Sequence, residues 1–256
     1  MLISLLTDFG TKDYFVGAMK GVILSINSEA KIVDITHQVE AQNIRSAGFI
    51  LAACYRDFPE KTIFVTVVDP GVGSDRQAVL VETEKYYFIA PDNGLLSLVL
   101  ANEKKYRVFE LTRQKYFREF RSLTFHGRDI FAPVAAWLSK GIEPKEFGRE
   151  LKDLVCLDIS FPKTISETEL EAEIIHIDHF GNLITNLKKN DLSKVFSLEV
   201  NGIELGKHHS FYAEAEKDEI FTIWGSARYL EIVANQNSAK DLIKIAVGDK
   251  ILVKLQ

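Results

Sequence analysis

Hydrophobic and polar residues alternate along the first half of the chain in two rhythms, one typical of buried strands and one of amphipathic helices. Short apolar runs at residues 2–6, 31–35 and 62–68 predict three strands. Between them, apolar side chains recur every three or four residues over 14–26 and 44–54, which predicts two helices. This strand–helix order indicates a mostly parallel sheet with helices on its faces.

The same domain continues with a pair of strands and two more helices. Apolar runs at 78–81 and 86–89 flank a short polar stretch and predict the strand pair, and residues 94–101 and 129–139 predict helices. We therefore expect an N-terminal Rossmann-like α/β sheet domain over residues 1–160.

The last hundred residues follow a different pattern, with short strands in place of the strand–helix alternation. Residues 162–169 are polar and contain a proline, which is typical of a linker. Apolar positions alternate over 196–200 before an Asn-Gly pair, a hairpin signal. Further apolar runs of strand length lie at residues 220–224, 229–233 and 251–255. We expect a smaller C-terminal all-β domain, a barrel or sandwich, over residues 161–256.

Composition narrows the range of functions. Of the 256 residues 46% are hydrophobic, the formal net charge is −5, and lysine and arginine are scattered, which argues against a nucleic-acid partner. No apolar run approaches the length of a membrane span, and no leader pattern opens the sequence, so we expect no membrane partner and a cytoplasmic protein. Cys54 and Cys156 are far apart, which favours free thiols in a reducing compartment.

The strongest candidate for chemistry is the loop that follows the strand at 62–68. It begins with Asp69, turns through a proline and two glycines, and reaches Arg76. Open α/β sheets bind ligands at the carboxyl ends of their strands, and glycines let backbone approach a ligand. The alternative interpretation is an ordinary turn with a surface ion pair.

A second polar cluster, residues 124–129, opens a later helix and contains His126 beside Gly127. An imidazole at the start of a helix can be kept neutral by the helix dipole. Helix capping is the alternative. With Asp69 and Arg76, His126 completes a candidate set of an acid, a base and a cation.

Asp8 follows the first strand and offers two acceptor oxygens, enough for both hydroxyls of a ribose. The alternative is a cap for the helix that begins near Asp13. The chain contains neither a Gly-x-Gly-x-x-Gly fingerprint nor a Gly-Lys-Ser/Thr phosphate loop, which favours a nucleoside over NAD or ATP. For Asp92 we prefer a turn that caps the helix beginning near Leu95.

In the β domain, Asp178, Phe180 and Asn182 combine an acid, an aromatic ring and an amide within five residues, which suits an amine, a flat base and the edge of that base. A bulge with an ordinary loop is the alternative.

Residues 225–229 form another small polar turn. Four histidines invite a metal interpretation, but no cysteine or paired acid completes a ligand set, so no metal site is predicted; they are His176, His179, His208 and His209.

Taken together, these motifs resemble a known family, the S-adenosyl-L-methionine (SAM) hydrolases that form adenosine, also called SAM hydroxide adenosyltransferases. They are similar to the fluorinating and chlorinating enzymes that act on the same compound. The resemblance covers nearly the whole chain, and its matching blocks are residues 7–10, 16–21, 34–37, 68–76, 90–94, 124–133, 178–186 and 226–235.

The resemblance implies a fold, an assembly and a reaction. It implies an N-terminal α/β domain, a C-terminal β domain and a homotrimer, with the substrate between the N domain of one subunit and the C domain of its neighbour. SAM would be the substrate, no cofactor would be needed, and the family's catalytic triad would be Asp69, Arg76 and His126.

The resemblance also implies the substrate contacts. Asp8 would hold the ribose hydroxyls, Asp13 and Asp178 the methionine amine. Phe180 would stack on adenine and Asn182 would bind its edge. The remaining contacts would be Ser226 with the methionine carboxylate, the backbone near Ala234 with adenine, and Tyr229 as a further substrate-binding residue.

This sequence departs from the halogenating relatives in ways that favour water as the nucleophile. Those relatives carry a tyrosine where Asp69 stands, a Tyr-Ser pair in place of His126 and Gly127, and an extra loop that we do not find here. An arginine follows their serine that matches Ser226, whereas Ala227 stands here. The alternatives are a halide-using 5′-halo-5′-deoxyadenosine synthase and a non-catalytic nucleoside-binding module; a methyltransferase is disfavoured because its glycine-rich first loop is absent.

Overall fold

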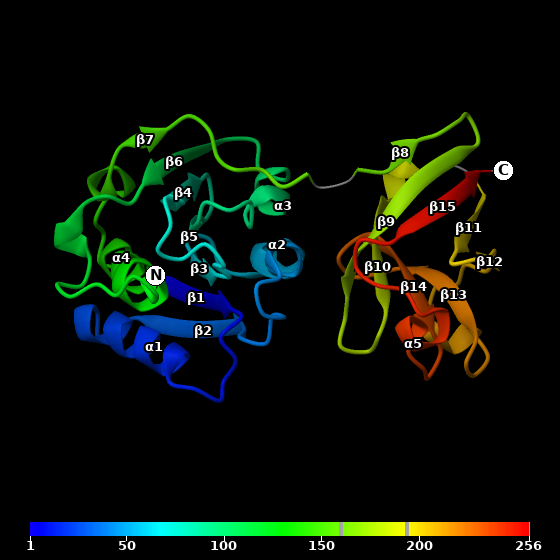
Figure 1. The fold of residues 1–256 in the computed structure, drawn as a ribbon, viewed down its shortest axis with the longest axis horizontal. Helices are drawn as coiled ribbons and strands as arrows, with labels where there is room; N and C mark the ends of the chain where they lie inside the picture. The colour runs from blue at the N-terminus through cyan, green and yellow to red at the C-terminus, as the bar shows by residue number, and fades with distance from the viewer. Residues whose placement is uncertain (159–160, 193–194, 256) are drawn as a thin grey trace. The chain divides into compact units, whose positions relative to one another are not determined.

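A computed structural model of the chain describes residues 1–158, 161–192 and 195–255. It divides into two compact units, Met1–Leu157 and Asp158–Gln256 (Figure 1). Residue 160, where the sequence predicts the first domain to end, lies outside the described residues. No helix in the described part of the chain is long and apolar enough to cross a membrane.

The first unit is built on one mixed sheet. Its strands are β1 (Leu2–Thr7), β2 (Lys31–Thr36), β3 (Ile63–Val67), β4 (Ala78–Thr83), β5 (Tyr87–Pro91), β6 (Tyr106–Glu110) and β7 (Glu150–Leu151). The order across the sheet is β2-β1-β3-β5-β4-β6-β7. Strands β2, β1, β3 and β5 run parallel, whereas β4 is antiparallel to both β5 and β6. The Rossmann-like description therefore holds only for the parallel part, because the β4–β5 hairpin reverses a strand.

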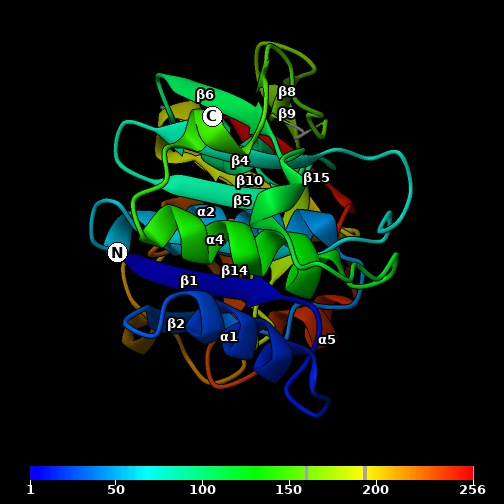
Figure 2. The same cartoon turned by 90° about the vertical axis from the view of Figure 1, so that its left-hand side faces the viewer.

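Helices cover both faces of this sheet; Figure 2 shows α1 and α4 together on one face, and α2 and α3 pack on the other. The four are α1 (Phe15–Ile26), α2 (Ile44–Cys54), α3 (Ser97–Leu100) and α4 (Ala132–Ser139). Alternate residues of each strand point to opposite faces. In β1, Leu5 therefore packs with Met19 of α1, while Leu6 packs with Leu51 of α2 in a separate core.

Two interpretations of helix starts are wrong: the alternative that Asp8 caps the first helix, and the preferred assignment of Asp92 to a helix-capping turn. The N-cap of α1 is Tyr14, without a side-chain hydrogen bond, so neither Asp8 nor Asp13 caps that helix. The helix expected over 94–101 is only α3, and Asp92 instead accepts a hydrogen bond from the Val155 backbone N–H at 2.9 Å. Asp8 and Asp92 therefore do not cap the start of a helix.

The second unit is a nearly closed antiparallel sheet. Its strands are β8 (Lys163–Thr164), β9 (Glu169–Ile177), β10 (Leu183–Lys188), β11 (Phe196–Val200), β12 (Ile203–Leu205), β13 (Ile220–Trp224), β14 (Tyr229–Ala234) and β15 (Lys250–Leu255). The order is β12-β11-β15-β9-β10-β14-β13, with β8 on β9. The chain after β12 returns to β13, where Thr222 bonds to Lys207 and His209 through its backbone at 3.0 Å each, which nearly closes the barrel.

Three local predictions for this unit have different outcomes. The Asn201-Gly202 turn joins β11 to β12, with φ of 49° and 77°, as the hairpin signal indicates. The expected linker at 162–169 instead contributes β8 and the first residue of β9. The unit is also not purely β, because α5 (Ala239–Ile243) buries Ala239 and Ile243 in the barrel core.

Short helical turns complete the two units. They are the 3₁₀ turns Tyr55–Asp57, Gln114–Tyr116, Pro144–Phe147, Lys189–Asp191 and Tyr212–Glu214, and the π-helical turn Gly127–Phe131, which leads directly into α4.

Candidate active site

The loop after β3 holds an aspartate and an arginine in direct contact. Arg76 Nε lies 2.9 Å and 3.0 Å from the two carboxylate oxygens of Asp69, and a terminal guanidinium nitrogen also donates to that carboxylate. The side chains are only 5% and 10% exposed for Asp69 and Arg76 respectively. This is a bidentate, nearly buried pair, so the alternative of an ordinary surface ion pair is wrong.

His126 joins this pair from a second loop. The terminal nitrogen of Arg76 lies 2.8 Å from His126 Nδ1. Because a guanidinium can only donate, Nδ1 accepts, and a neutral ring carries its proton on Nε2. The guanidinium is also 5.5 Å from the ring centre of Phe131, which helps to hold it in place. Asp69, Arg76 and His126, predicted as one set, are therefore in contact.

The environment of His126 favours its neutral form. Burial, and next the positive charge of Arg76, lower the pKa of His126 below its usual value, and Asp69 offsets only part of this. His126 precedes the π-helical turn, but its side chain makes no capping bond. The neutral ring is therefore explained by burial and Arg76, whereas the sequence argument invoked the helix dipole.

One backbone contact joins the loops of Arg76 and His126, and one buried carboxylate holds the second loop together from within. Gly73, at φ 81°, lies against the backbone of Leu123, where an added Cβ would be 2.5 Å from the carbonyl oxygen. Asp129 is fully buried and accepts hydrogen bonds from Arg128 Nε at 2.7 Å and the Ser122 N–H at 2.8 Å. Burial alone would raise the pKa of Asp129, but these donors outweigh it and the pKa is lowered. Sequence reasoning noted Asp129 only as the last member of its cluster; the adjacent Arg-Asp pair was the available signal.

Asp8 lies at the same edge of the sheet as the triad. Thr7 and Val67 are paired in the parallel ladder of β1 and β3, so Asp8 and Asp69 both leave the sheet at its carboxyl edge. Asp8 Oδ2 accepts the backbone N–H of Gln42 at 2.8 Å, and Oδ1 has no hydrogen-bond partner among the described residues. Asp13 is exposed on the loop between β1 and α1.

An aromatic cluster separates the loop of Asp8 from that of His126. Phe125 packs edge-on against Phe9 and Phe15, with ring centres 5.8 Å and 5.2 Å apart. Gly127 lies within this cluster. A Cβ at Gly127 would be 3.3 Å from Met19 Sδ and 3.4 Å from the Phe9 ring, tighter than ordinary contact. The position directly after His126 in the sequence therefore favours glycine.

In the second unit, the loop between β9 and β10 gathers three predicted residues. Asp178 accepts the N–H groups of Phe180 and Asn182 and the Asn182 side-chain amide, each at 2.9 Å. Asn182 also donates to the Tyr212 hydroxyl at 3.2 Å. Phe180 is 73% exposed. The loop therefore fixes an acid and an amide and leaves one aromatic ring exposed beside His179.

The remaining predicted residues lie in the turn between β13 and β14 and in β14 itself. Ser226 is exposed at its tip, while Tyr229 is buried beneath the Lys188 ammonium, which is 5.4 Å from its ring centre. Ala234 is buried at the end of β14 and paired with Ile220. No hydrogen bond joins Ser226 to the loop of Asp178 among the described residues.

Sequence reasoning did not single out Glu231, which lies in β14 against this turn and within electrostatic reach of Asp178. Its carboxylate lies over Gly225, where an added Cβ would be 1.6 Å from Oε1, and it has no hydrogen-bond partner in the described part of the chain. Burial and then the charge of Asp178 raise the pKa of Glu231 to about 7. The signal was a single acid in the apolar run of β14, a position that alternation places on the barrel face opposite its core.

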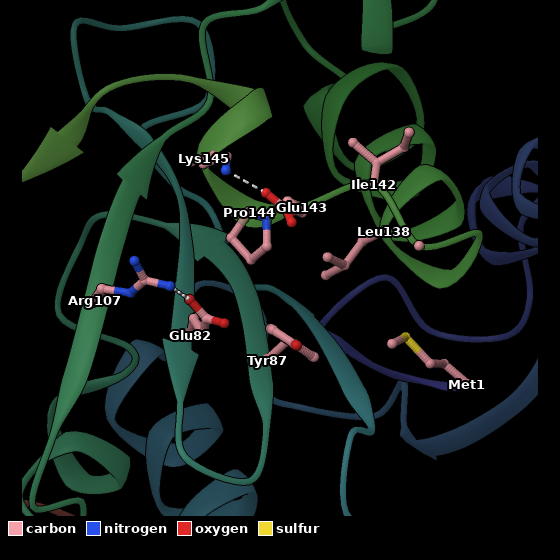
Figure 3. A pocket seen from close by; sticks show the side chains of 10 residues that line it. Met1, Glu82, Tyr87, Arg107, Leu138, Ile142, Glu143, Pro144 and Lys145 are labelled. Atoms are coloured by element: carbon pink, nitrogen blue, oxygen red, sulfur yellow. Dashed lines mark hydrogen bonds and ion pairs between the residues drawn. The ribbon is translucent and has the colours of Figure 1, made fainter.

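No group of three or more metal-ligating side chains occurs among the described residues. A pocket of about 400 Å³ does occur in the first unit, at the amino ends of its parallel strands, the edge opposite the triad. Figure 3 shows that its charged side chains are already paired, Arg107 with Glu82 at 2.6 Å and Lys145 with Glu143 at 2.5 Å. We therefore assign no chemistry to this pocket.

Comparisons with known proteins agree over both units. Residues 3–148 match the SAM hydroxide adenosyltransferase N-terminal domain, and residues 172–252 match the C-terminal domain. An (R)-S-adenosyl-L-methionine hydrolase from Methanocaldococcus jannaschii is 35% identical, covering 98% of this chain and 94% of its own. A fluorinase from an Actinoplanes species is 30% identical over 75% of this chain and 74% of its own.

A solved structure shows the same architecture. The crystal structure of an uncharacterised conserved protein from Thermotoga maritima superimposes with a TM-score of 0.91 and 35% identity, covering 98% of this chain and 99% of that one.

Proposed function

Because the chain belongs to the SAM hydroxide adenosyltransferase family, we propose that it hydrolyses S-adenosyl-L-methionine to adenosine and L-methionine. The observation that carries the proposal is the buried contact of Asp69, Arg76 and His126 at the carboxyl edge of the sheet. Open α/β sheets bind their ligands at this edge.

The reaction needs a positioned water and no covalent intermediate. The water oxygen bonds to C5′ as the C5′–S bond breaks, and the bonding pair leaves with sulfur, so the sulfonium becomes the neutral thioether of methionine. One water proton is released. Holding the two reactants in line supplies on the order of 7–11 kcal/mol of the barrier reduction.

Each triad member has a distinct part in this proposal. Asp69 accepts a hydrogen bond from the water and stabilises the positive charge of the proton as the O–H bond weakens. Arg76 holds Asp69 ionised and oriented through its bidentate contact. His126, neutral with its proton on Nε2, donates toward the developing hydroxide beside the nearly buried pair of Asp69 and Arg76.

We further propose the substrate contacts that the resemblance implies. In the first unit, the free Oδ1 of Asp8 suits a ribose hydroxyl, and the exposed Asp13 is available to the methionine amine. In the second unit, the exposed ring of Phe180 suits adenine, and the Asn182 amide suits its edge.

The cationic end of the substrate is assigned to the rest of the second unit. Asp178, supported by Glu231, attracts the methionine ammonium. Ser226 contacts the methionine carboxylate. Ala227 stands where the halogenating relatives have an arginine, so we assign a second contact with this carboxylate to the exposed Arg228, whose φ is 66°. Tyr229 supports this turn, and the backbone at Ala234 meets adenine.

The assembly proposed is a homotrimer in which the domains 1–160 and 161–256 that serve one substrate come from neighbouring subunits. A cytoplasmic location belongs to the same proposal, and the free thiols of Cys54 and Cys156 agree with a reducing compartment.

A halide-using reaction is the rival chemistry. The tight surroundings of Gly127 disfavour the serine that halogenating relatives carry there. The test is to incubate the protein with SAM in chloride-free buffer, then in chloride, and to separate the products. Equimolar adenosine and methionine in both buffers supports hydrolysis. Chloride-dependent 5′-chloro-5′-deoxyadenosine would replace it with the rival, and unchanged substrate with tight adenosine binding would indicate a binding module.

A further inference from the structure

The loops that follow β1 and β2 are joined by a chain of polar contacts centred on His37. His37 is 4% exposed, and its Nδ1 lies 2.9 Å from Thr7 Oγ1, beside Asp8. Its Nε2 lies 3.1 Å from Asp34 Oδ1, in an ion-pair contact too bent to count as a hydrogen bond. Asp34 Oδ2 in turn accepts from Lys20 Nζ at 2.6 Å. The chain runs from the surface of α1 to the buried end of β1.

The chemistry of the donors gives this chain a direction. Asp34 is held ionised, because burial would raise its pKa but the contacts from Lys20 and His37 outweigh burial and lower it. An ionised carboxylate only accepts, so the His37 proton sits on Nε2 and Nδ1 accepts from the Thr7 hydroxyl. Thr7 Oγ1, fully buried, accepts the Phe9 N–H at 3.2 Å.

The loop after β2 also bonds to Asp8 and to Gly10, two residues further along the chain. The His37 carbonyl accepts the Gly10 N–H at 2.7 Å, and the Gln42 N–H donates to Asp8 Oδ2 at 2.8 Å. Gln42 adopts φ 66°, a left-handed conformation that is unfavourable for a residue other than glycine. A strained residue that aims its N–H at a carboxylate indicates that the orientation of Asp8 is built into the fold.

We propose that His37, held by Asp34 and Lys20, is the positioning residue for the Asp8 carboxylate and thereby sets how strongly the protein prefers ribose over 2′-deoxyribose in its substrate. This inference rests on the proposed function, which gives Asp8 the ribose hydroxyls. A site built to bond a hydroxyl rejects the analogue that lacks it, provided the acceptor is held in place. Loosening the acceptor weakens this discrimination even though the acceptor remains.

The test compares SAM with its 2′-deoxy analogue. We expect His37→Ala to lower kcat/KM for SAM about 10- to 100-fold, the effect of a misplacement near 1 Å, and to change kcat/KM for the analogue less than about threefold. His37→Asn keeps an acceptor for the Thr7 hydroxyl and should recover part of the discrimination. In combination with Asp8→Asn, His37→Ala should add little, because both changes act through one carboxylate.

A matched control is available in the second unit. His208 Nδ1 lies 3.1 Å from Thr222 Oγ1, the same pairing of residue types, and His208 is not assigned to the site. His208→Ala should leave the ratio of kcat/KM values at that of the wild type. Thermal unfolding of each variant shows whether it is folded, and His37→Asn supplies the answer if His37→Ala is not.

The outcomes separate the inference from the function on which it rests. Equal losses on both substrates, or additive effects with Asp8→Asn, would show that His37 is merely structural and overturn the inference. A wild-type protein that neither hydrolyses SAM nor binds adenosine more tightly than 2′-deoxyadenosine would overturn both. A wild-type protein that hydrolyses SAM without any preference for the 2′-hydroxyl would overturn the inference alone.

Discussion

The two candidate clusters treat their carboxylates in opposite ways. In the first unit, Asp69 is neutralised within the protein, by the bidentate Arg76, which also contacts a neutral His126. In the second unit, Asp178 is held by neutral amide donors, and Glu231 has no partner among the described residues. One cluster is complete before a ligand arrives, whereas in the other no Lys or Arg forms an ion pair with Asp178 or Glu231 among the described residues.

This difference indicates a division of labour. A group that orients water during a reaction works best when it is fixed and its charge is already compensated, since no reorganisation is then needed. A group that recognises a cation gains by leaving its charge available. In the proposed reaction, the ammonium of SAM suits the second cluster, while the reacting carbon suits the first.

The largest effect is expected for Asp69→Ala, which removes the proposed acceptor for the water. We expect kcat to fall about 1,000-fold, within the range for general acid–base groups, while adenosine affinity stays within about threefold. Asp75→Ala, in the same loop but exposed, is the matched control and should retain activity. Single-turnover kinetics and calorimetry measure both quantities. An active Asp69→Ala protein would refute the triad.

The next largest effect is expected for His126→Gln, which replaces the ring donor. The loss of a donor to developing negative charge predicts a fall in kcat of about 100-fold. The pKa of His126 is below its usual value, so in the wild type the neutral form, and with it activity, should persist as pH falls through the usual histidine range. A wild-type kcat that rises on protonation would contradict a neutral donor.

Phe180→Ala tests the binding cluster without altering its charge. Stacking of a base on an aromatic ring contributes about 1–3 kcal/mol, so adenosine affinity should fall about tenfold, with kcat at saturating SAM preserved. Phe180→Trp should retain affinity. Phe161→Ala, another exposed phenylalanine, is the control. Equal affinity of Phe180→Ala and the wild type for adenosine would remove Phe180 from the site.

The smallest effect is expected for Glu231→Gln, which removes charge and keeps shape. KM for SAM should rise about fivefold, the effect of one partly solvated ion pair, with little change in kcat. In the wild type, KM should fall as pH rises through about 7 and Glu231 ionises, whereas the variant should lack this dependence. Glu199→Gln, whose carboxylate pairs with Lys254, is the control. A pH-independent wild-type KM would exclude Glu231 from binding.

The raised pKa of Glu231 also predicts how the free energy of unfolding changes with pH. Because that pKa is raised on folding, the folded state binds more protons than the unfolded state between the ordinary glutamate pKa and about 7. The free energy of unfolding should therefore decrease as pH rises through this window. The decrease should be absent in Glu231→Gln, and denaturant titrations at several pH values measure it. A stability that rises for both proteins alike would assign the dependence to other groups.

Local sequence signals were sufficient where a short segment determines its own conformation. The strand at β3, the hairpin turn Asn201-Gly202 and the stripe of α1 are all recognisable, because periodicity and turn chemistry act over a few residues. The short length of α3 and the role of Asp92 were not recognisable from the sequence, because Asp92 bonds to Val155, which is 63 residues away. Such a partner exists only after the chain has folded back.

The sequence by itself determined the alternation of strands and helices, the acidic and basic residues at strand ends and, through resemblance, the reaction. Only the tertiary structure decided which of these residues touch. Arg76 bonds Asp69 and His126 at once, and Gly73 brings their two loops together. Asp129 holds the loop of His126 from within, and Glu231 has no hydrogen-bond partner among the residues that the structure describes. The physical reason is that charge compensation and burial depend on neighbours distant in sequence. The local pattern places a carboxylate, and the fold decides whether its charge is balanced.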